Sequence, residues 1–492
     1  MFGFFSRSFV RRLPIFLAAV SLWAAGAARS GYAGDLRAAL EKAARNPPAP
    51  ASGVSIAIAE EKGDAPLLFG SNAGTPLTIA SVSKLFSTAA ALSALGKDYR
   101  FKTALYRTGT VAGGLLSGSL LVVGGGDPNL SGRFYDNDIH AVFDRWADGL
   151  RAAGITRVSG DLLLNAAFFD DEFRNPGWPT GQEARWYEAP VSALSFNDNC
   201  ISVSVGPGSR PGAPAAVRFQ PSTSFLQAVS SARTVSARRG ARVAVARRAG
   251  SNIVTVAGTV PYSLAGWSTV IAIDDPPRYF GTVLKERLAS DGITVDGQVR
   301  ISATRPDPTW SAVATTTSDL LPSIAVANKR SQSFYAEQIF KTLAAEKGKQ
   351  GSWTEAVRLE KDFLRSLGLD PARYDLFDGS GLNPRNRVAA LDIVRFLRAM
   401  AALPVADDWV ATLAVSGNGD GTLRHRFRDH AVRGRVYAKT GSLDRVNSLA
   451  GFVTAASGKS YVFAIVLNGR RVNDGTGHAF EDRVLRALLV NG

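Results

Sequence analysis

Ser81 and Lys84 are the first residues in the chain whose types and spacing fit nucleophilic catalysis. They lie in Ala80-Ser81-Val82-Ser83-Lys84, where an apolar helical pattern begins that runs to about Leu95. A spacing of three residues places the lysine amine on the helix face that carries the serine hydroxyl. A neutral lysine can act as the base that a serine nucleophile needs, and a helix start offers N–H groups to an oxyanion. The same pattern also fits an N-cap serine followed by a solvated lysine.

A second candidate group lies in a strand-like run near the C-terminal end, at Lys439, Thr440, Gly441 and Ser442. The lysine ammonium and the threonine hydroxyl can bind a terminal carboxylate, and the glycine lets a substrate backbone approach closely. The backbone N–H of Ser442 can complete an oxyanion hole with that of Ser81. An exposed hairpin strand is the alternative interpretation.

The elements that would position these residues come from both ends of the chain. Alternating apolar residues over 53–59, followed by 66–69, predict a hairpin with one buried face. Apolar residues at three- and four-residue steps predict helices over 331–345, 352–366, 388–402 and about 477–490. Strand-like runs cover 434–439, 448–455 and 461–467.

The middle of the chain differs in composition and residue pattern. Residues 106–310 are rich in Gly, Val, Thr and short alternating runs, which indicates antiparallel β structure, with 137–153 as the main helical exception. Residues 207–260 are rich in Pro, Ser, Arg and Gly and form a candidate nested unit. We therefore expect one catalytic domain built from both ends, with a large insertion between them.

Residues 1–33 have the pattern of a secretion signal peptide. Arg7, Arg11 and Arg12 precede an apolar stretch, and small residues that suit signal peptidase follow it. A retained membrane anchor is the alternative, but the apolar run is short for a spanning helix. We expect export to the periplasm or cell envelope after cleavage.

Composition limits the remaining possibilities. The formal charge of +15 favours anionic partners, and export makes nucleic acid improbable, which leaves peripheral contact with a membrane or an anionic wall polymer. The single cysteine, Cys200, cannot form an internal disulfide and is expected to be buried. The four histidines lack ligand spacing, so no metal site and no cofactor is expected.

The two chemical groups, in this order, resemble the penicillin-recognising serine enzymes with S-x-x-K and K-T-G motifs. Four further segments resemble signatures of class C low-molecular-mass penicillin-binding proteins, the D-alanyl-D-alanine carboxypeptidase/endopeptidase family. They are Val123-Gly124-Gly125-Gly126-Asp127-Pro128, residues 187–199 (YEAPVSALSFNDN), Asp378-Gly379-Ser380-Gly381-Leu382 and residues 416–423 (SGNGDGTL).

This resemblance implies a multidomain α/β plus β fold. Its penicillin-binding/β-lactamase-like transpeptidase domain, an α/β sandwich with a helical subdomain, would comprise residues 34–105 and 311–492. The β-rich insertion, residues 106–310, would split that domain and contain two nested subdomains.

The resemblance also implies an acyl-enzyme mechanism on peptidoglycan stem peptides. Lys84 would deprotonate Ser81, the Ser81 oxygen would attack the penultimate D-alanine carbonyl, and Ser331 with Lys439 would relay a proton to the leaving D-alanine. Thr440, Gly441 and Ser442 would bind the substrate. β-Lactams would acylate the same serine, and the oligomeric state is left open.

One motif departs from the family. The S-x-N motif reads Ser331-Gln332-Ser333 here, so Ser333 replaces the asparagine and normal turnover is in question. Literal S-x-N strings at Ser195 and Ser416 lie inside other signatures and are interpreted as structural. In the segment where some relatives carry an acid that binds diaminopimelate, this chain has Gln182 next to Glu183, and a plain surface loop is the equal alternative.

Three rival functions stay open. A β-lactamase or esterase on the same fold is disfavoured by the large insertion. A penicillin-binding wall scaffold with weak activity is supported by Ser333 alone. A nucleic-acid binder is suggested only by the charge.

Overall fold

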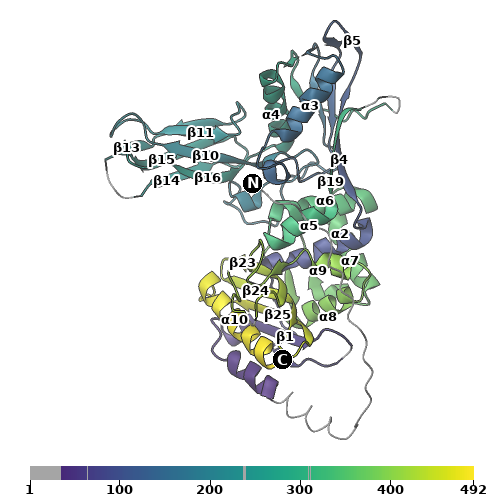
Figure 1. Cartoon of the computed structure of the whole chain (residues 1–492), viewed down its shortest axis with the longest axis vertical. Coiled ribbons are helices and arrows are strands. Elements are labelled where there is room, and N and C mark those ends of the chain that lie inside the picture. Colours follow the sequence, from purple (N-terminus) through teal and green to yellow (C-terminus); the bar gives the residue numbers. More distant parts are fainter. Residues whose placement is uncertain (1–34, 64, 237–239, 308–309, 311, 431) are drawn as a thin grey trace.

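The computed structural model describes residues 35–492, apart from 64, 237–239, 308–309, 311 and 431. The predicted signal peptide lies outside these residues. Within them, no helix is both long and apolar enough to cross a bilayer. The first described element is a helix over residues 35–43. The molecule is elongated, with a sheet at one end, a helical layer next to it and a β-rich region at the other end (Figure 1).

Both ends of the described chain contribute strands to one antiparallel sheet. Strand β1 lies between β2 and β25, and its residues Val54 and Glu60 are opposite Leu467 and Tyr461 of β25. The first strand of the predicted hairpin and the three predicted C-terminal strands belong to this sheet, and the second hairpin strand begins at Phe69, later than the predicted 66–69. Its order is β2 (Phe69–Ser71), β1 (Val54–Glu60), β25 (Ser460–Asn468), β24 (Val446–Thr454), β23 (Val436–Leu443) and β22 (Ala414–Val415).

Both faces of this sheet are covered, so the expectation of one buried face for residues 53–59 is wrong. Ile56 and Ile58 belong to the core on the side of α10 (Asp474–Asn491). Ala57 and Ala59 belong to the core shared with helices of the opposite face. Small side chains on that face let the helices approach closely, and the alternation of large and small residues was mistaken for an alternation of buried and exposed ones.

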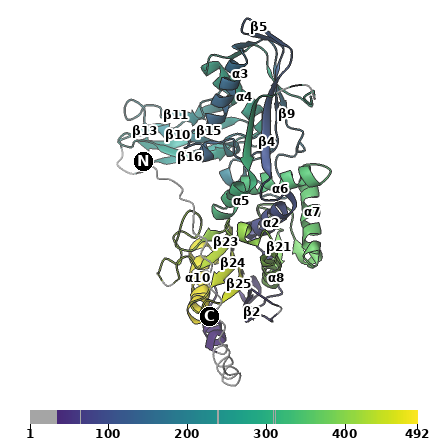
Figure 2. The same ribbon diagram turned by 45° about the vertical axis from the view of Figure 1, so that its right-hand side comes forward.

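A helical layer covers the second face of the sheet and separates it from the β-rich region (Figures 1 and 2). The predicted helices after residue 330 are confirmed. We did not predict α5, because Pro322 interrupts its pattern. Proline is tolerated there because the first-turn N–H groups have no partner within the helix. The layer contains α2 (Lys84–Leu95), α5 (Leu320–Lys329), α6 (Ser333–Lys347), α7 (Trp353–Ser366), α8 (Ala390–Ala401) and α9 (Ala406–Val410).

Strands β4 and β19 connect the helical layer to the β-rich region and pair with each other, Arg100 opposite Asp319. They lie in a five-stranded sheet of order β18 (Val299–Ile301), β9 (Leu162–Asn165), β7 (Leu120–Val123), β4 (Arg100–Arg107) and β19 (Ala312–Asp319). A four-stranded sheet adjoins it, with β17 (Thr294–Val295), β8 (Arg157–Val158), β6 (Leu115–Ser117) and β5 (Thr110–Ala112). The exact bounds of the insertion, 106–310, remain a prediction.

Two helices pack on these sheets, α3 (Ala141–Ala152) and α4 (Pro276–Ser290). We predicted α3 but not α4. The pair Pro276-Pro277 has the composition of a loop, yet these residues occupy the first positions of α4, where proline is favoured. The side chain of Asp275 caps this helix by accepting a hydrogen bond from the backbone N–H of Arg278.

A β arm, residues 200–272, projects sideways from the β-rich region (Figure 1). One of its sheets has the order β11 (Ala216–Gln220), β10 (Cys200–Gly206) and β16 (Trp267–Ala272). In the other, β15 (Ile253–Pro261) pairs with β12 (Gln227–Ser230), β13 (Arg233–Val235) and β14 (Arg242–Arg247). Cys200 is buried at the base, as expected.

The remaining elements are short. A three-stranded sheet beside the helical layer contains β20 (Tyr374–Asp375), β21 (Arg387–Ala389) and β3 (Pro76–Thr78). The 3₁₀ turns are η1 (Ala51–Gly53), η2 (Ala80–Ser83), η3 (Gly132–Phe134), η4 (Trp186–Glu188), η5 (Asn197–Asn199) and η6 (Pro371–Arg373).

Glu360 on α7 is a buried acid whose carboxylate lacks hydrogen bonds from the described residues. Its side chain is fully buried, and neither carboxylate oxygen has a hydrogen-bond partner among the described residues. Burial, followed by the nearby charges of Asp378 and Glu337, raises the pKa of Glu360 well above its ordinary value. The unfolded chain ionises at lower pH than the folded one, so this residue costs stability as the pH rises.

We therefore expect Glu360→Gln to stabilise the protein at neutral pH and to have little effect near pH 4. The difference should grow by about 1.4 kcal/mol per pH unit above about pH 4.3, until the folded-state carboxyl ionises. Urea unfolding between pH 4 and 8 measures it. Glu355→Gln on the same helix should behave oppositely, because Arg358 lowers the pKa of Glu355 and that charge stabilises the fold at neutral pH. A pH-independent difference for Glu360→Gln would contradict this account.

Candidate active site

Ser81 lies in the turn η2, between strand β3 and helix α2, rather than in the first turn of an α-helix as expected. The turn is strained, because Ala80 adopts a φ of +48° in the left-handed region. Two contacts hold it. Ser448 of β24 donates a hydrogen bond to the carbonyl of Ile79 at 2.7 Å, and Gly381 lies so close that a Cβ there would be 1.9 Å from the Ala80 oxygen.

Lys84 begins α2 and is fully buried beneath Ser81. Its Nζ donates hydrogen bonds to Ser81 Oγ at 3.0 Å, to Ser333 Oγ at 3.3 Å and to the Ser380 carbonyl at 2.6 Å. Burial lowers the pKa of Lys84 to about 8, against the opposing charges of Glu337 and Asp378. A large fraction of this amine can therefore be neutral at mildly alkaline pH, which a general base requires.

Glu337 of α6 anchors the loop that receives the Lys84 amine. Its carboxylate accepts hydrogen bonds from the backbone N–H groups of Gly379 and Ser380 and from the Trp353 indole, at 2.7–3.1 Å. Burial, followed by the charge of Asp378, raises the pKa of Glu337 to about 7. The sequence analysis did not identify this residue as part of the site.

A second lysine–serine pair stands beside the first. Lys439 of β23 is fully buried, and its Nζ donates hydrogen bonds to Ser331 Oγ at 2.8 Å and to the Thr440 carbonyl at 2.7 Å. Burial, followed by the charge of Lys84, lowers the pKa of Lys439 well below its ordinary value. Ser331 has a φ of +57°, a strained backbone conformation that α6 follows two residues later.

Strand β23 forms the opposite wall. A Cβ at Gly441 would lie 3.0 Å from Ser81 N and 2.6 Å from the Ile79 oxygen, so only glycine lets this strand reach the serine turn. Thr440 donates a hydrogen bond to Thr422 Oγ1 at 2.9 Å. The hydroxyl of Ser442 donates to Asp474 Oδ1 at 2.7 Å.

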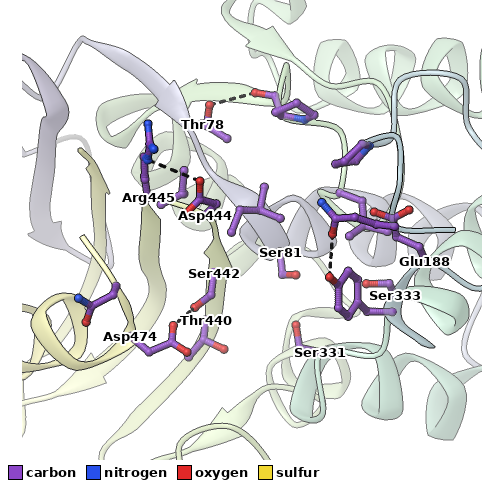
Figure 3. A pocket seen from close by; sticks show the side chains of 18 of the residues that line it. Thr78, Ser81, Glu188, Ser331, Ser333, Thr440, Ser442, Asp444, Arg445 and Asp474 are labelled. Atoms are coloured by element: carbon purple, nitrogen blue, oxygen red, sulfur yellow. Dashed lines mark hydrogen bonds and ion pairs between the residues drawn. The ribbon is translucent and has the colours of Figure 1, made fainter. Parts of the chain in front are cut away.

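These residues surround a cavity of about 880 Å³. Figure 3 shows Ser81 between Thr440 and Ser442 on one side and Ser331 and Ser333 on the other. The serine and threonine side chains line the cavity, while Lys84 and Lys439 lie behind them and are not lining residues. The outer wall includes Pro179, Gln182, Trp186, Tyr187, Arg330, Thr422, Asn473 and Asp474.

Comparison with known proteins identifies the family. The sequence profile described as "D-Ala-D-Ala carboxypeptidase 3 (S13) family" matches residues 36–487. The chain belongs to the S13 peptidase family. A D-alanyl-D-alanine carboxypeptidase of Actinomadura sp. (strain R39) is 32% identical over 466 residues, which cover 91% of this chain and 82% of the relative.

This S13 peptidase is also similar to proteins of Haemophilus influenzae. D-alanyl-D-alanine carboxypeptidase DacB is 26% identical over 425 residues, 85% of each chain. The crystal structure of penicillin binding protein 4 (dacB) has a TM-score of 0.78 at 23% identity and covers 92% of this chain and 99% of that one. The resemblance to class C low-molecular-mass penicillin-binding proteins and the expected fold class are confirmed, and the chain is a serine-type peptidase.

The structure brings every residue proposed for the S13 peptidase site together, with one change of position. Lys439 was expected to face a substrate carboxylate, but its ammonium is buried behind Ser331. The hydroxyls of Thr440 and Ser442 are the groups of this strand that line the cavity. Among the described residues, no group of three or more His, Cys, Asp or Glu side chains could hold a metal ion.

The serine of each literal S-x-N string is buried in a hydrogen-bond network, and no residue of either string lines the cavity. Ser195 Oγ accepts hydrogen bonds from Asn199 and Gln338, and Ser416 Oγ accepts them from the backbone N–H groups of Arg435 and Val436. The segment that contains Ser416 nevertheless supplies Thr422 to the cavity, a residue that the sequence analysis did not single out.

Gln182 and Trp186 both line the cavity. Gln182 accepts a hydrogen bond from the Tyr187 hydroxyl at 2.7 Å, whereas Glu183 accepts one from the backbone N–H of Gly181. Trp186 is 44% exposed. The loop that carries these residues is therefore a wall of the cavity rather than only a surface connection.

We expect acylation by a fluorescent penicillin to follow the titration of Lys84. If the neutral amine is the base, the second-order rate should rise with pH and level off above about pH 8, with about 100-fold loss at pH 6. Glu337→Gln removes a charge that raises the pKa of Lys84, so its profile should shift to lower pH. Lys84→Arg keeps a cation that cannot deprotonate and should be inactive. A rate that is flat from pH 6 to 9 would exclude Lys84 as the base.

Ser333→Asn tests the unusual middle motif. Ser333 Oγ accepts a hydrogen bond from Lys84 Nζ at 3.3 Å, a long distance for such a bond, and Ser333 lines the cavity. An asparagine amide would add a contact worth about 0.5–1.5 kcal/mol, so kcat/KM on a D-alanyl-D-alanine peptide should rise several-fold. Ser331→Ala, measured alongside, should lower it. Full activity of Ser331→Ala would show that the motif is placed wrongly.

Proposed function

We propose that this S13 peptidase is an exported D-alanyl-D-alanine carboxypeptidase that acts on peptidoglycan stem peptides through an ester on Ser81. The observation that carries the proposal is the 3.0 Å contact between Lys84 Nζ and Ser81 Oγ at the wall of the cavity. A serine hydroxyl that contacts a buried amine of lowered pKa is an activated nucleophile.

In the acylation half-reaction, Lys84 takes the proton of Ser81 while Oγ attacks the carbonyl carbon of the penultimate D-alanine. The oxyanion is held by the backbone N–H groups of Ser81 and Ser442, which the close approach at Gly441 supports. The C–N bond then breaks. Ser331, hydrogen-bonded to Lys439, relays to the leaving nitrogen the proton that Lys84 took from Ser81, so Lys84 is neutral again.

In the deacylation half-reaction, water replaces the departed D-alanine. Lys84 takes a proton from this water, and the resulting oxygen nucleophile attacks the ester carbonyl. Ser81 leaves with a proton from Lys84, and the shortened peptide is released. Thr440 and Ser442, whose hydroxyls line the cavity, bind the terminal carboxylate of the substrate.

The same cavity supports two further activities. A β-lactam offers a strained amide to Ser81 and would leave a stable ester. A cavity of about 880 Å³ has room for a leaving group larger than one D-alanine, which supports endopeptidase action on D-alanyl cross-links. The contact between Ser333 and Lys84 disfavours a purely scaffolding role, because the middle motif still reaches the base.

Ser81→Ala should abolish two signals together. One is D-alanine release from diacetyl-L-lysyl-D-alanyl-D-alanine, and the other is the mass increase of the intact protein after incubation with penicillin. Both should be lost because no covalent ester can form. Nitrocefin turnover faster than D-alanine release by the wild type would instead indicate a β-lactamase.

Ser83→Ala is the matched control. The Ser83 hydroxyl is buried in the same turn, does not line the cavity and has no hydrogen-bond partner among the described residues. The variant should keep both the acylation and the peptide turnover. Penicillin labelling that survives in Ser81→Ala would overturn the assignment of the nucleophile.

A further inference from the structure

The β arm carries an unusual charge. Residues 200–272 contain eight arginines and neither aspartate, glutamate nor lysine, so this segment holds more than half of the net charge of +15. Arg247 is buried at the base and forms an ion pair with Asp274, at 3.5 Å. The arm has no carboxylate of its own that could neutralise the other arginines.

Three exposed arginines gather at the end of the arm that points away from the molecule. Arg233 of β13 and Arg242 of β14 both lie opposite Thr259 of β15, one on each side. They therefore project from the same face of the sheet, about 10 Å apart at the backbone. The turn that contains Arg210 joins them, because the N–H of Gly212 donates to the carbonyl of Thr234.

Between this end and the base, the sheet face exposes the small residues Ala244, Ala246, Thr255 and Ala257 of β14 and β15, and near the base the larger apolar residue Ile253. We call this surface, with Arg210, Arg233 and Arg242, the arginine face. Like charges held together repel one another, and an extended anionic chain laid across the face would remove that repulsion.

The base of the arm is joined to the wall of the active-site cavity. The guanidinium of Arg247 donates hydrogen bonds to the carbonyls of Ala272 and Glu183, and the N–H of Ala272 donates to the carbonyl of Ala184. These contacts hold the loop that supplies Gln182 and Trp186 to the cavity. A polymer with one side branch in the cavity would thus have neighbouring branches within reach of the arm.

We propose that the arginine face binds the free carboxylates of peptidoglycan stem peptides and holds the enzyme on its polymeric substrate. The inference rests on the proposed function, since that function supplies the polymer. Guanidinium groups pair with carboxylates through two parallel hydrogen bonds. Each exposed pair is weak by itself, so binding arises from several pairs along one chain and is sensitive to salt.

Co-sedimentation with insoluble peptidoglycan tests the proposal, with Ser81→Ala as the parent so that the polymer stays intact. Adding Arg210→Gln, Arg233→Gln and Arg242→Gln should lower the bound fraction roughly fivefold or more at low salt. About 0.5 M salt should release the parent as well. Amidation of the peptidoglycan carboxylates should have the same effect as the three substitutions.

A control with the same change in charge uses Arg45→Gln, Arg107→Gln and Arg428→Gln, three exposed arginines on other parts of the molecule. It should sediment as the parent does. Equal sedimentation of the arm variant and the parent would overturn the proposal. The proposal would also be overturned if the arm variant lost binding to phosphatidylglycerol vesicles but bound peptidoglycan as the parent does. That result would indicate that the arginine face binds a lipid surface.

The failure of this inference is distinguishable from failure of the proposed function. When Ser81 is kept, the variant with the three arm substitutions should release D-alanine from the soluble peptide at the wild-type rate, because that peptide does not reach the arm. Absence of release by the wild type would refute the proposed function, whatever the sedimentation result.

Discussion

The burial of the Lys84 amine is the constraint on which the rest of the site depends. An exposed lysine is protonated at neutral pH and cannot accept a proton from serine. Burial lowers its pKa to about 8, but it also removes the amine from water, so three acceptor oxygens must replace the lost hydration. Ser81, Ser333 and the Ser380 carbonyl supply them.

Each of these acceptors comes from a different part of the chain, which explains much of the architecture. The Ser380 carbonyl is fixed by Glu337, through the backbone N–H groups that its carboxylate holds. Ser333 begins the helix that carries Glu337. The serine turn is pressed between Gly381 and Gly441, where any Cβ would collide with it. A site of this kind requires the two ends of the chain to fold into one unit.

The β-rich region leaves this unit intact, because the chain enters and leaves it through two strands that pair with each other, β4 and β19. It nevertheless reaches back to the cavity through the loop of Gln182 and Trp186, which Arg247 ties to the arm. The large insertion therefore forms part of the wall of the cavity that contains the catalytic groups. Substitutions at the base of the arm can alter the cavity without touching Ser81.

The sequence by itself determined the chemistry and most of the elements. The spacing of Ser81 and Lys84 and the run from Lys439 to Ser442 have local meaning, since a helix turn and a strand place their side chains by short-range geometry. The strand and helix patterns after residue 330 are likewise local. Local patterns misled us at Pro322 and Pro276-Pro277, where proline sits in the first turn of a helix. They also predicted antiparallel pairing throughout residues 106–310, whereas β9 pairs in parallel with both β7 and β18.

Only the tertiary structure decided which partners those residues meet. Glu337 is an ordinary charged residue in the sequence, and only its hydrogen bonds to the N–H groups of Gly379 and Ser380 make it the anchor of that loop. Lys439 was recognised from the sequence, but not its burial behind Ser331. Ser333 could be recognised as a substitution, but its contact with Lys84 joins positions 249 residues apart. The serine hydroxyls were predictable because their positions depend on short-range spacing. Their electrostatic surroundings were not, because burial and pKa depend on neighbours that sequence spacing does not specify.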